Sequence, residues 1–146
     1  MSLKQPNNYL KPRYMSPEQV RGMMMKLSEK HGIKLHYLNG NEGDGDNANR
    51  SFCAGCIGSG DIYLGVYEDI ELEVISFFHE LVHVIFDFDR SVISTMQYEL
   101  YVTFKALEYA EKECKVLFSD DAIKWMLEQC LTYHRWDERE VRGYKF

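Results

Sequence analysis

Two histidines stand four residues apart in the segment His79–His83, and a glutamate, Glu80, directly follows the first of them. Residues four apart in an α-helix project from the same face about one turn apart, so both imidazole rings can reach one metal ion. A glutamate beside two such histidines can act as a general base toward a water molecule on that ion. The spacing therefore favours a zinc site on a helix, with His79 and His83 as ligands and Glu80 as the base.

The residues around this motif have the periodicity of a helix with two different faces. With His79 at 0° and about 100° per residue, His83 lies at about 40° and Glu80 at about 100°. The apolar side chains fill the opposite arc, and the remaining polar ones lie between about 60° and 120°. The apolar residues are Val74, Ile75, Phe78, Leu81, Val82, Ile85 and Phe86, and the polar ones are Glu73, Ser76 and Asp87. We therefore expect the histidines at the boundary between a buried and an exposed face. The alternative is a pair of half-buried histidines that only donate hydrogen bonds.

A catalytic zinc usually has three protein ligands, so the motif needs a third. Asp87 is about 12 Å from His79 along a continuous helix, which is too far. Glu99 lies on a later predicted helix and shares its face with apolar or small residues, namely Met96, Thr103, Ala106, Leu107 and Ala110. An inward carboxylate needs a cation or hydrogen-bond donors. We predict Glu99 as the third ligand. The alternative is a carboxylate that only accepts hydrogen bonds, and Glu113 lies near the same face.

The four cysteines give a weaker signal than the histidines. Cys53 and Cys56 have the spacing of a zinc knuckle, but two ligands do not make a structural zinc site. We therefore expect them in a β-hairpin. Cys114 and Cys130 fall at helical positions and are expected as small core residues. Four other side chains can each stabilise an oxyanion, and the sequence does not choose among them: Tyr98, Tyr101, Tyr133 and His134.

The elements that must position these residues begin with a helix and a strand. Ser16 and Gln19 form a predicted capping box with Pro17 at the first helical position, and the helix should end at Gly32. Residues 33–38 then alternate with period two, as a half-buried strand does. We expect this first helix to pack against a sheet that begins with that strand.

The rest of the chain is expected to complete an α+β fold. Residues 39–50 are polar and rich in glycine and asparagine, which is typical of a long loop, and they lack the glutamate that closes an EF-hand calcium loop. Residues 51–57 and 62–67 flank a glycine-rich turn and predict a hairpin in a short mixed or antiparallel sheet. Three helices follow, at residues 69–86, 94–116 and 119 to about 134, the last two with Ser94 and Ser119 as N-caps.

Length and composition limit the classes of protein. The 146 residues, 45% hydrophobic and 27% charged, predict one globular domain over residues 1–146, with tails at 1–15 and 135–146. Seventeen Lys and Arg against 23 Asp and Glu give a net charge of −6, and no basic stripe favours direct contact with nucleic acid. No segment approaches the roughly 20 apolar residues of a membrane span, and no secretory signal is recognisable. We expect a cytoplasmic protein with reduced thiols.

Residues 16–110 resemble the ImmA/IrrE family of zinc metallopeptidases. The resemblance rests on the strand at residues 62–65, the motif helix with His79–His83 and the next helix with Glu99. It implies a small zincin-like domain in which His79, His83 and Glu99 hold Zn²⁺ and Glu80 is the catalytic acid/base. The family is often encoded by mobile elements and cleaves repressor-type transcription regulators. The resemblance thus implies a polypeptide substrate such as a helix-turn-helix regulator.

We therefore expect a zinc-dependent peptidase in which zinc-activated water attacks a peptide carbonyl and Glu80 is the general base. The strand at 62–67 can offer its edge to an extended peptide. One alternative is a non-catalytic, zinc-braced interaction protein of a mobile element. A second is a helical core that holds no metal.

Overall fold

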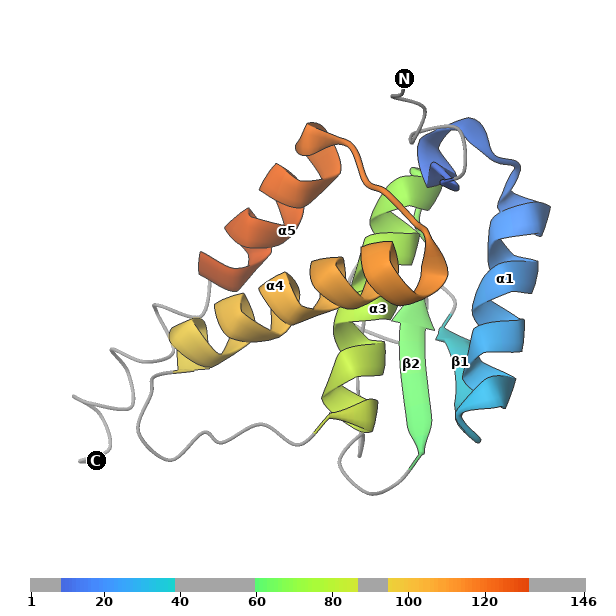
Figure 1. The fold of residues 1–146 in the computed structure, drawn as a ribbon, viewed down its shortest axis with the longest axis horizontal. Coiled ribbons are helices and arrows are strands. Elements are labelled where there is room, and N and C mark those ends of the chain that lie inside the picture. The colour runs from blue at the N-terminus through green and yellow to red at the C-terminus, as the bar shows by residue number, and fades with distance from the viewer. Residues whose placement is uncertain (1–8, 39–59, 87–94, 132–146) are drawn as a thin grey trace.

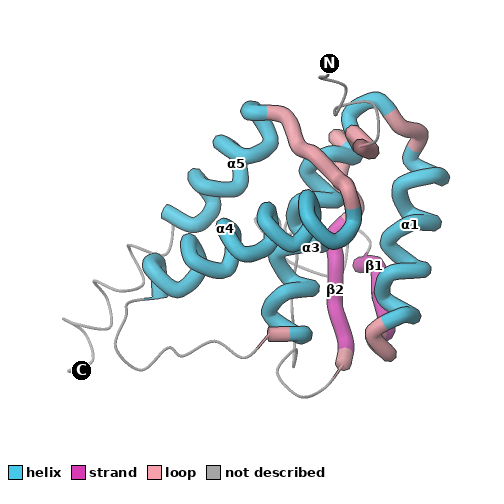
Figure 2. The backbone as a smooth tube through the Cα atoms, in the orientation of Figure 1, coloured by secondary structure: helices cyan, strands magenta, loops and turns pink. Residues whose placement is uncertain are grey.

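The computed structural model describes residues 9–38, 60–86 and 95–131 and shows a mixed α+β fold (Figures 1 and 2). These parts of the chain form four α-helices and a small two-stranded sheet, which contacts α1 and α3. In chain order the elements are η2 (Pro12–Tyr14), α1 (Pro17–Lys30), β1 (Lys34–Leu38), β2 (Asp61–Gly65), α3 (Ile70–Ile85), α4 (Thr95–Cys114) and α5 (Asp120–Leu131). The motif helix α3 lies between the sheet and α4, and α5 follows α4, as the sequence predicts for two helices after the motif.

The helix boundaries confirm the capping signals wherever the caps are described. Ser16 Oγ accepts a hydrogen bond from Gln19 N at 3.1 Å, and Gln19 Oε1 accepts one from Ser16 N at 3.1 Å, which completes the capping box of α1. Gly32 has φ +69°, a left-handed conformation that ends this helix without a Cβ clash. Ser119 Oγ accepts from Ala122 N at 3.2 Å at the start of α5. Ser94 lies outside the described residues.

The described part of the sheet consists of two strands. β1 and β2 pair in parallel, from Lys34 opposite Asp61 to Leu38 opposite Gly65, which is compatible with the predicted mixed sheet and not with a purely antiparallel one. Residues 39–60 connect the two strands and are long enough for the crossover that a parallel pair requires. The strand predicted at residues 51–57 lies outside the described residues, as do Cys53, Cys56 and the polar loop at 39–50.

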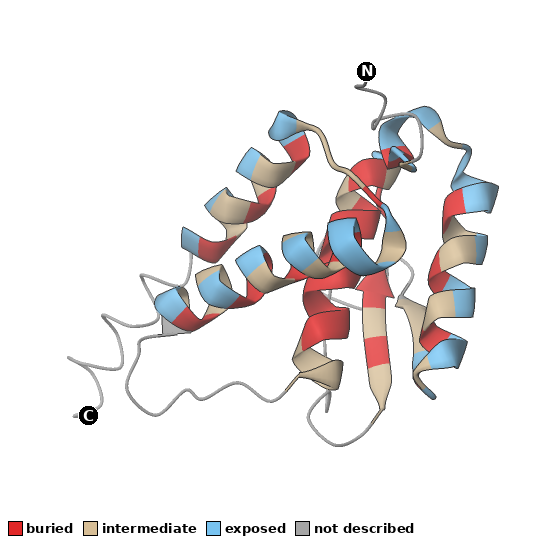
Figure 3. Ribbon diagram, in the orientation of Figure 1, coloured by how far each residue is buried: buried red, intermediate tan, exposed pale blue. Residues whose placement is uncertain are grey.

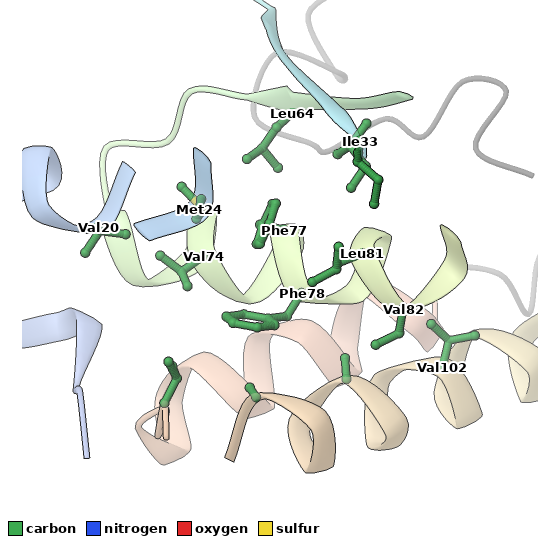
Figure 4. Close-up of a cluster of buried hydrophobic side chains, with 14 of the residues drawn as sticks. Val20, Met24, Ile33, Leu64, Val74, Phe77, Phe78, Leu81, Val82 and Val102 are labelled. Carbon is green, nitrogen blue, oxygen red and sulfur yellow. The ribbon is translucent and has the colours of Figure 1, made fainter. Parts of the chain in front are cut away.

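Helix α3 is the centre of the fold, and its middle is buried on every side (Figure 3). Residues 73–82 are all buried. Phe77 lies on the side of Leu64 in β2, whereas Val82 lies on the side of Val102 in α4 (Figure 4). Val20 and Met24 of α1 belong to the same hydrophobic cluster (Figure 4).

The prediction that the polar face of the motif helix is exposed to solvent is therefore wrong. Glu73, Ser76 and Glu80 are at most 8% exposed. The sequence placed these residues correctly on one arc, but other elements cover that arc and supply polar partners. Ser76, for example, donates to Tyr67 Oη at 3.3 Å.

Glu73 ties three other parts of the chain to α3. Its carboxylate, 0% exposed, accepts two hydrogen bonds from Arg21 of α1 at 2.8 Å each. It also accepts from Tyr37 Oη of β1 at 2.8 Å and from Tyr67 N, after β2, at 3.1 Å. The hydrogen bond with Glu73 raises the pKa of Arg21 above its ordinary value. This one carboxylate thus fixes the position of α1 and the sheet against the motif helix.

Part of the segment expected as an N-terminal tail lies against the body of the protein. Leu10 N donates to Lys115 O at 2.7 Å, and Leu117 N donates to Leu10 O at 2.9 Å. Pro12 is buried. Residues 135–146, the other expected tail, are outside the described residues. None of the helices in the described ranges is both long and apolar enough to pass through a membrane.

Replacement of Arg21 by alanine should destabilise the protein by about 3 kcal/mol, because it leaves the Glu73 carboxylate buried without its cation. The free energy of unfolding of Arg21→Ala, measured by urea titration at neutral pH, tests this expectation. Lys26→Ala is the matched control, since Lys26 is an exposed cation on the same helix. That control should change stability by no more than about 0.5 kcal/mol. Equal effects of the two variants would contradict the role given to Glu73.

Candidate metal centre

The three predicted ligands meet at one point between α3 and α4, which cross in the view of Figure 1. His79 Nε2 lies 2.6 Å from Glu99 Oε1, and His83 Nε2 lies 3.1 Å from the same oxygen. The side chains of His79, His83 and Glu99 are 8%, 9% and 12% exposed. Two histidines one turn apart on α3 and a carboxylate from α4 therefore form a single cluster that could hold a metal ion.

The spacing of the three ligand atoms fits a small tetrahedral ion. All three atoms lie within 4.8 Å of one another. Zinc bonds of about 2.0–2.1 Å at tetrahedral angles place neighbouring ligand atoms about 3.3–3.4 Å apart. The two distances to Glu99 Oε1, 2.6 and 3.1 Å, would have to lengthen by less than an ångström. Side-chain rotation alone can supply such a change.

The charges in the cluster favour an ionised carboxylate. Burial alone would raise the pKa of the Glu99 carboxyl, but hydrogen bonds from His79 and His83 lower it to about 2. For His79, burial would lower the pKa, whereas the hydrogen bond with Glu99 and the negative charges of Glu80 and Glu99 raise it above its usual value. Glu99 is thus ionised and paired with His79, and a metal ion could take the place of the proton between them.

The other nitrogen of each imidazole also has a partner. His79 Nδ1 lies 2.9 Å from Thr103 Oγ1, and His83 Nδ1 lies 3.2 Å from Tyr98 Oη. Sequence reasoning placed Thr103 on the face of Glu99 only as a packing residue. Its spacing of four from Glu99 was the available signal, because it puts both side chains on one side of α4. Tyr98 entered the sequence analysis as one of several oxyanion candidates, and nothing in the sequence indicates its contact with His83.

Glu80 is buried beside the cluster, 8% exposed. It belongs to the same turn of α3 as His79, and its charge contributes to the raised pKa of that histidine. The expected boundary position of the motif is therefore replaced by a nearly enclosed one, in which residues of α4 contact both histidines.

The remaining sequence candidates divide into three groups. Glu113 is exposed near the end of α4, and this removes it as a rival to Glu99. Cys130 is buried as predicted, whereas Cys114 is half-buried and Tyr101 is 55% exposed. Outside the described residues lie Asp87, Tyr133 and His134.

Comparisons of the chain with models of protein families, with curated proteins and with solved structures found no match. The interpretation of the cluster therefore rests on its own geometry and chemistry.

Zinc should stabilise the folded protein by binding to this cluster. At a free zinc concentration of 100 times the Kd, the gain is about 2.7 kcal/mol, or roughly 5–10 °C in Tm for a domain of this size. Glu99→Gln removes the anionic ligand and should abolish most of the shift. Differential scanning fluorimetry with zinc and with a chelator measures both effects.

The matched control is Glu111→Gln, because Glu111 is an exposed carboxylate on the same helix. Its zinc-dependent shift in Tm should equal that of the unmodified chain. An equal shift in Glu99→Gln would exclude Glu99 as a ligand, and no shift in the unmodified chain would favour a helical core that holds no metal.

Proposed function

We propose that this protein is a zinc-dependent peptidase with a zincin-like fold. The observation that carries the proposal is the convergence of His79, His83 and Glu99 on one point, with Glu80 buried beside them. The sequence motif alone requires only two histidines on one helix face. The third ligand comes from a separate helix and supports a metal centre rather than an accidental motif.

Zinc is the metal that these donors favour. Two imidazole nitrogens and one carboxylate oxygen make a donor set found in catalytic zinc sites, whereas calcium and magnesium prefer sites built from oxygen alone. A bound zinc ion lowers the pKa of its water to about 7 and polarises a carbonyl oxygen.

Glu80 supplies the proton transfers of the reaction. Its carboxylate accepts a proton from the attacking water, and its carboxylic acid then donates that proton to the departing amine. Burial of Glu80 at 8% exposure keeps bulk water from competing for this proton. Its position next to His79 in the same helical turn holds it near the metal ligands without using it as one.

The proposed substrate is a polypeptide, with repressor-type helix-turn-helix regulators as the class that the ImmA/IrrE-like motif implies. The net charge of −6 agrees with a protein that acts on a DNA-binding regulator without contacting DNA itself. β2 contacts α3 and stays a candidate edge for an extended peptide. We place the protein in the cytoplasm, where such regulators act.

A second candidate function is supported by the burial of the site. The three ligand side chains are 8–12% exposed, a range that also suits a structural metal. In this alternative the ion braces α3 against α4, and the protein acts by binding a partner. The two functions differ in what they require of Glu80.

Glu80→Gln distinguishes the two functions, because glutamine keeps the size of the side chain and removes the base. The variant should bind zinc as before and lose about 10²–10⁴-fold in the rate of peptide hydrolysis. Zinc content by mass spectrometry is measured together with the cleavage of fluorescent casein and of purified helix-turn-helix regulators.

Glu68→Gln is the control, since Glu68 is an exposed glutamate shortly before α3. It should leave hydrolysis unchanged. Zinc-loaded protein that cleaves none of these substrates, or Glu80→Gln with full activity, would refute the peptidase and leave the brace as the better account of the metal centre.

A further inference from the structure

Thr103 stands at the centre of a buried chain of hydrogen bonds that joins three helices. Thr103 is only 1% exposed. Its hydroxyl lies 2.9 Å from His79 Nδ1 on α3 and 3.2 Å from Cys130 Sγ on α5. Cys130 Sγ in turn donates to the backbone oxygen of Glu99, one turn before Thr103 on α4, at 3.5 Å. The network thus connects a predicted metal ligand on α3 to the backbone that carries another on α4.

The protons in this network can be assigned from the donors available. A thiol has one hydrogen, and that of Cys130 is directed to the Glu99 carbonyl. The Thr103 hydroxyl then donates its own hydrogen to Cys130 Sγ, and its lone pairs remain for a donor on the other side. That donor is His79 Nδ1–H. His79 Nδ1 therefore keeps its proton, and Nε2, which lies 2.6 Å from Glu99 Oε1, is the nitrogen that gives up its proton when a metal ion takes its place.

We propose that Thr103 is a positioning residue that holds His79 in the Nδ1–H form with Nε2 directed at the metal. The proposal rests on the metal centre of the proposed function and assigns a role to a side chain that touches neither the ion nor the substrate. Metal-binding histidines are usually oriented by an acceptor at the second nitrogen, most often a carboxylate, a carbonyl or water. Here a threonine hydroxyl performs that role.

The position of Thr103 in α4 explains why a threonine serves here. Glu99 and Thr103 are four residues apart, so one turn of α4 presents both the carboxylate and the hydroxyl to α3. The two groups contact opposite nitrogens of the same ring, at 2.6 and 2.9 Å. The imidazole is therefore clamped from both sides. Cys130 Sγ of α5 lies 3.2 Å from the Thr103 hydroxyl. The packing of α5 therefore contributes to the geometry of the site.

Thr103→Val tests the proposal, because valine has nearly the same shape and lacks the hydroxyl. Zinc affinity, measured by competition with a chromophoric chelator, should fall about 10–100-fold. Thr103→Ser restores the hydroxyl and should bind zinc within about threefold of the unmodified chain. Ser28→Ala removes a buried hydroxyl of α1 outside this network and should leave the affinity unchanged.

A second readout follows the proton itself. In zinc-loaded protein, ¹H–¹⁵N spectra should show a slowly exchanging proton on His79 Nδ1, and Thr103→Val should accelerate its exchange with water. The Tm of each metal-free variant reports whether it folds. If valine prevents folding, Thr103→Ala removes the same hydroxyl with a smaller side chain and carries the same expectations.

The outcomes separate this inference from the proposed function. Folded Thr103→Val with the affinity of the unmodified chain, or zinc bound through His79 Nδ1, would overturn the role of Thr103 and leave the metal centre in place. An unmodified chain that binds no zinc would overturn both.

Discussion

The burial of α3 on every side is the constraint on which the rest of the structure depends. A helix surrounded in this way normally carries apolar residues alone, yet α3 buries Glu71, Glu73, Ser76, His79 and Glu80. Buried polar groups without partners cost several kcal/mol each, so other elements must meet them. The Glu71 carboxylate accepts hydrogen bonds from Ser119 N and Ser119 Oγ, just before α5, at 2.6 and 2.8 Å. Glu73 accepts hydrogen bonds from Arg21 of α1 and Tyr37 of β1. His79 is within hydrogen-bond distance of Glu99 and Thr103 of α4. The polar groups of one helix thus determine where its neighbours dock.

The candidate metal centre is the part of this arrangement in which the partners are themselves ionisable. Glu73 is neutralised by Arg21, a permanent cation, and its remaining hydrogen bonds come from Tyr37 and Tyr67. Glu99 is instead paired with two imidazoles, whose charge depends on protonation. A cation of fixed charge would stabilise the ionised carboxylate at any protonation state of the two imidazoles. This difference separates the cluster at α3 and α4, which could hold a metal ion, from the Glu73 cluster, which is structural.

Much of the fold and the core of the site follow from local sequence signals. Capping residues set the starts of α1 and α5, and the spacing of the motif together with the inward position of Glu99 identified the three residues that the structure brings together. Two features depend on contacts between distant segments and were missed. The parallel pairing of β1 and β2 is decided by the connection between them rather than by either strand. The burial of the polar arc of α3 is decided by Arg21, Tyr37 and Tyr67, none of which carries a signal for this contact in its own segment.

Glu80 is the residue on which the choice between a catalytic and a structural metal depends. A metal that only braces α3 against α4 needs His79, His83 and Glu99 as ligands and does not require a base beside them. Burial of that group to 8% exposure costs free energy of desolvation, and its negative charge stabilises the protonated form of His79, which has no nitrogen lone pair left for a metal ion. A peptidase requires the carboxylate, and the cost of keeping it buried is then the cost of holding a base where the reaction needs one.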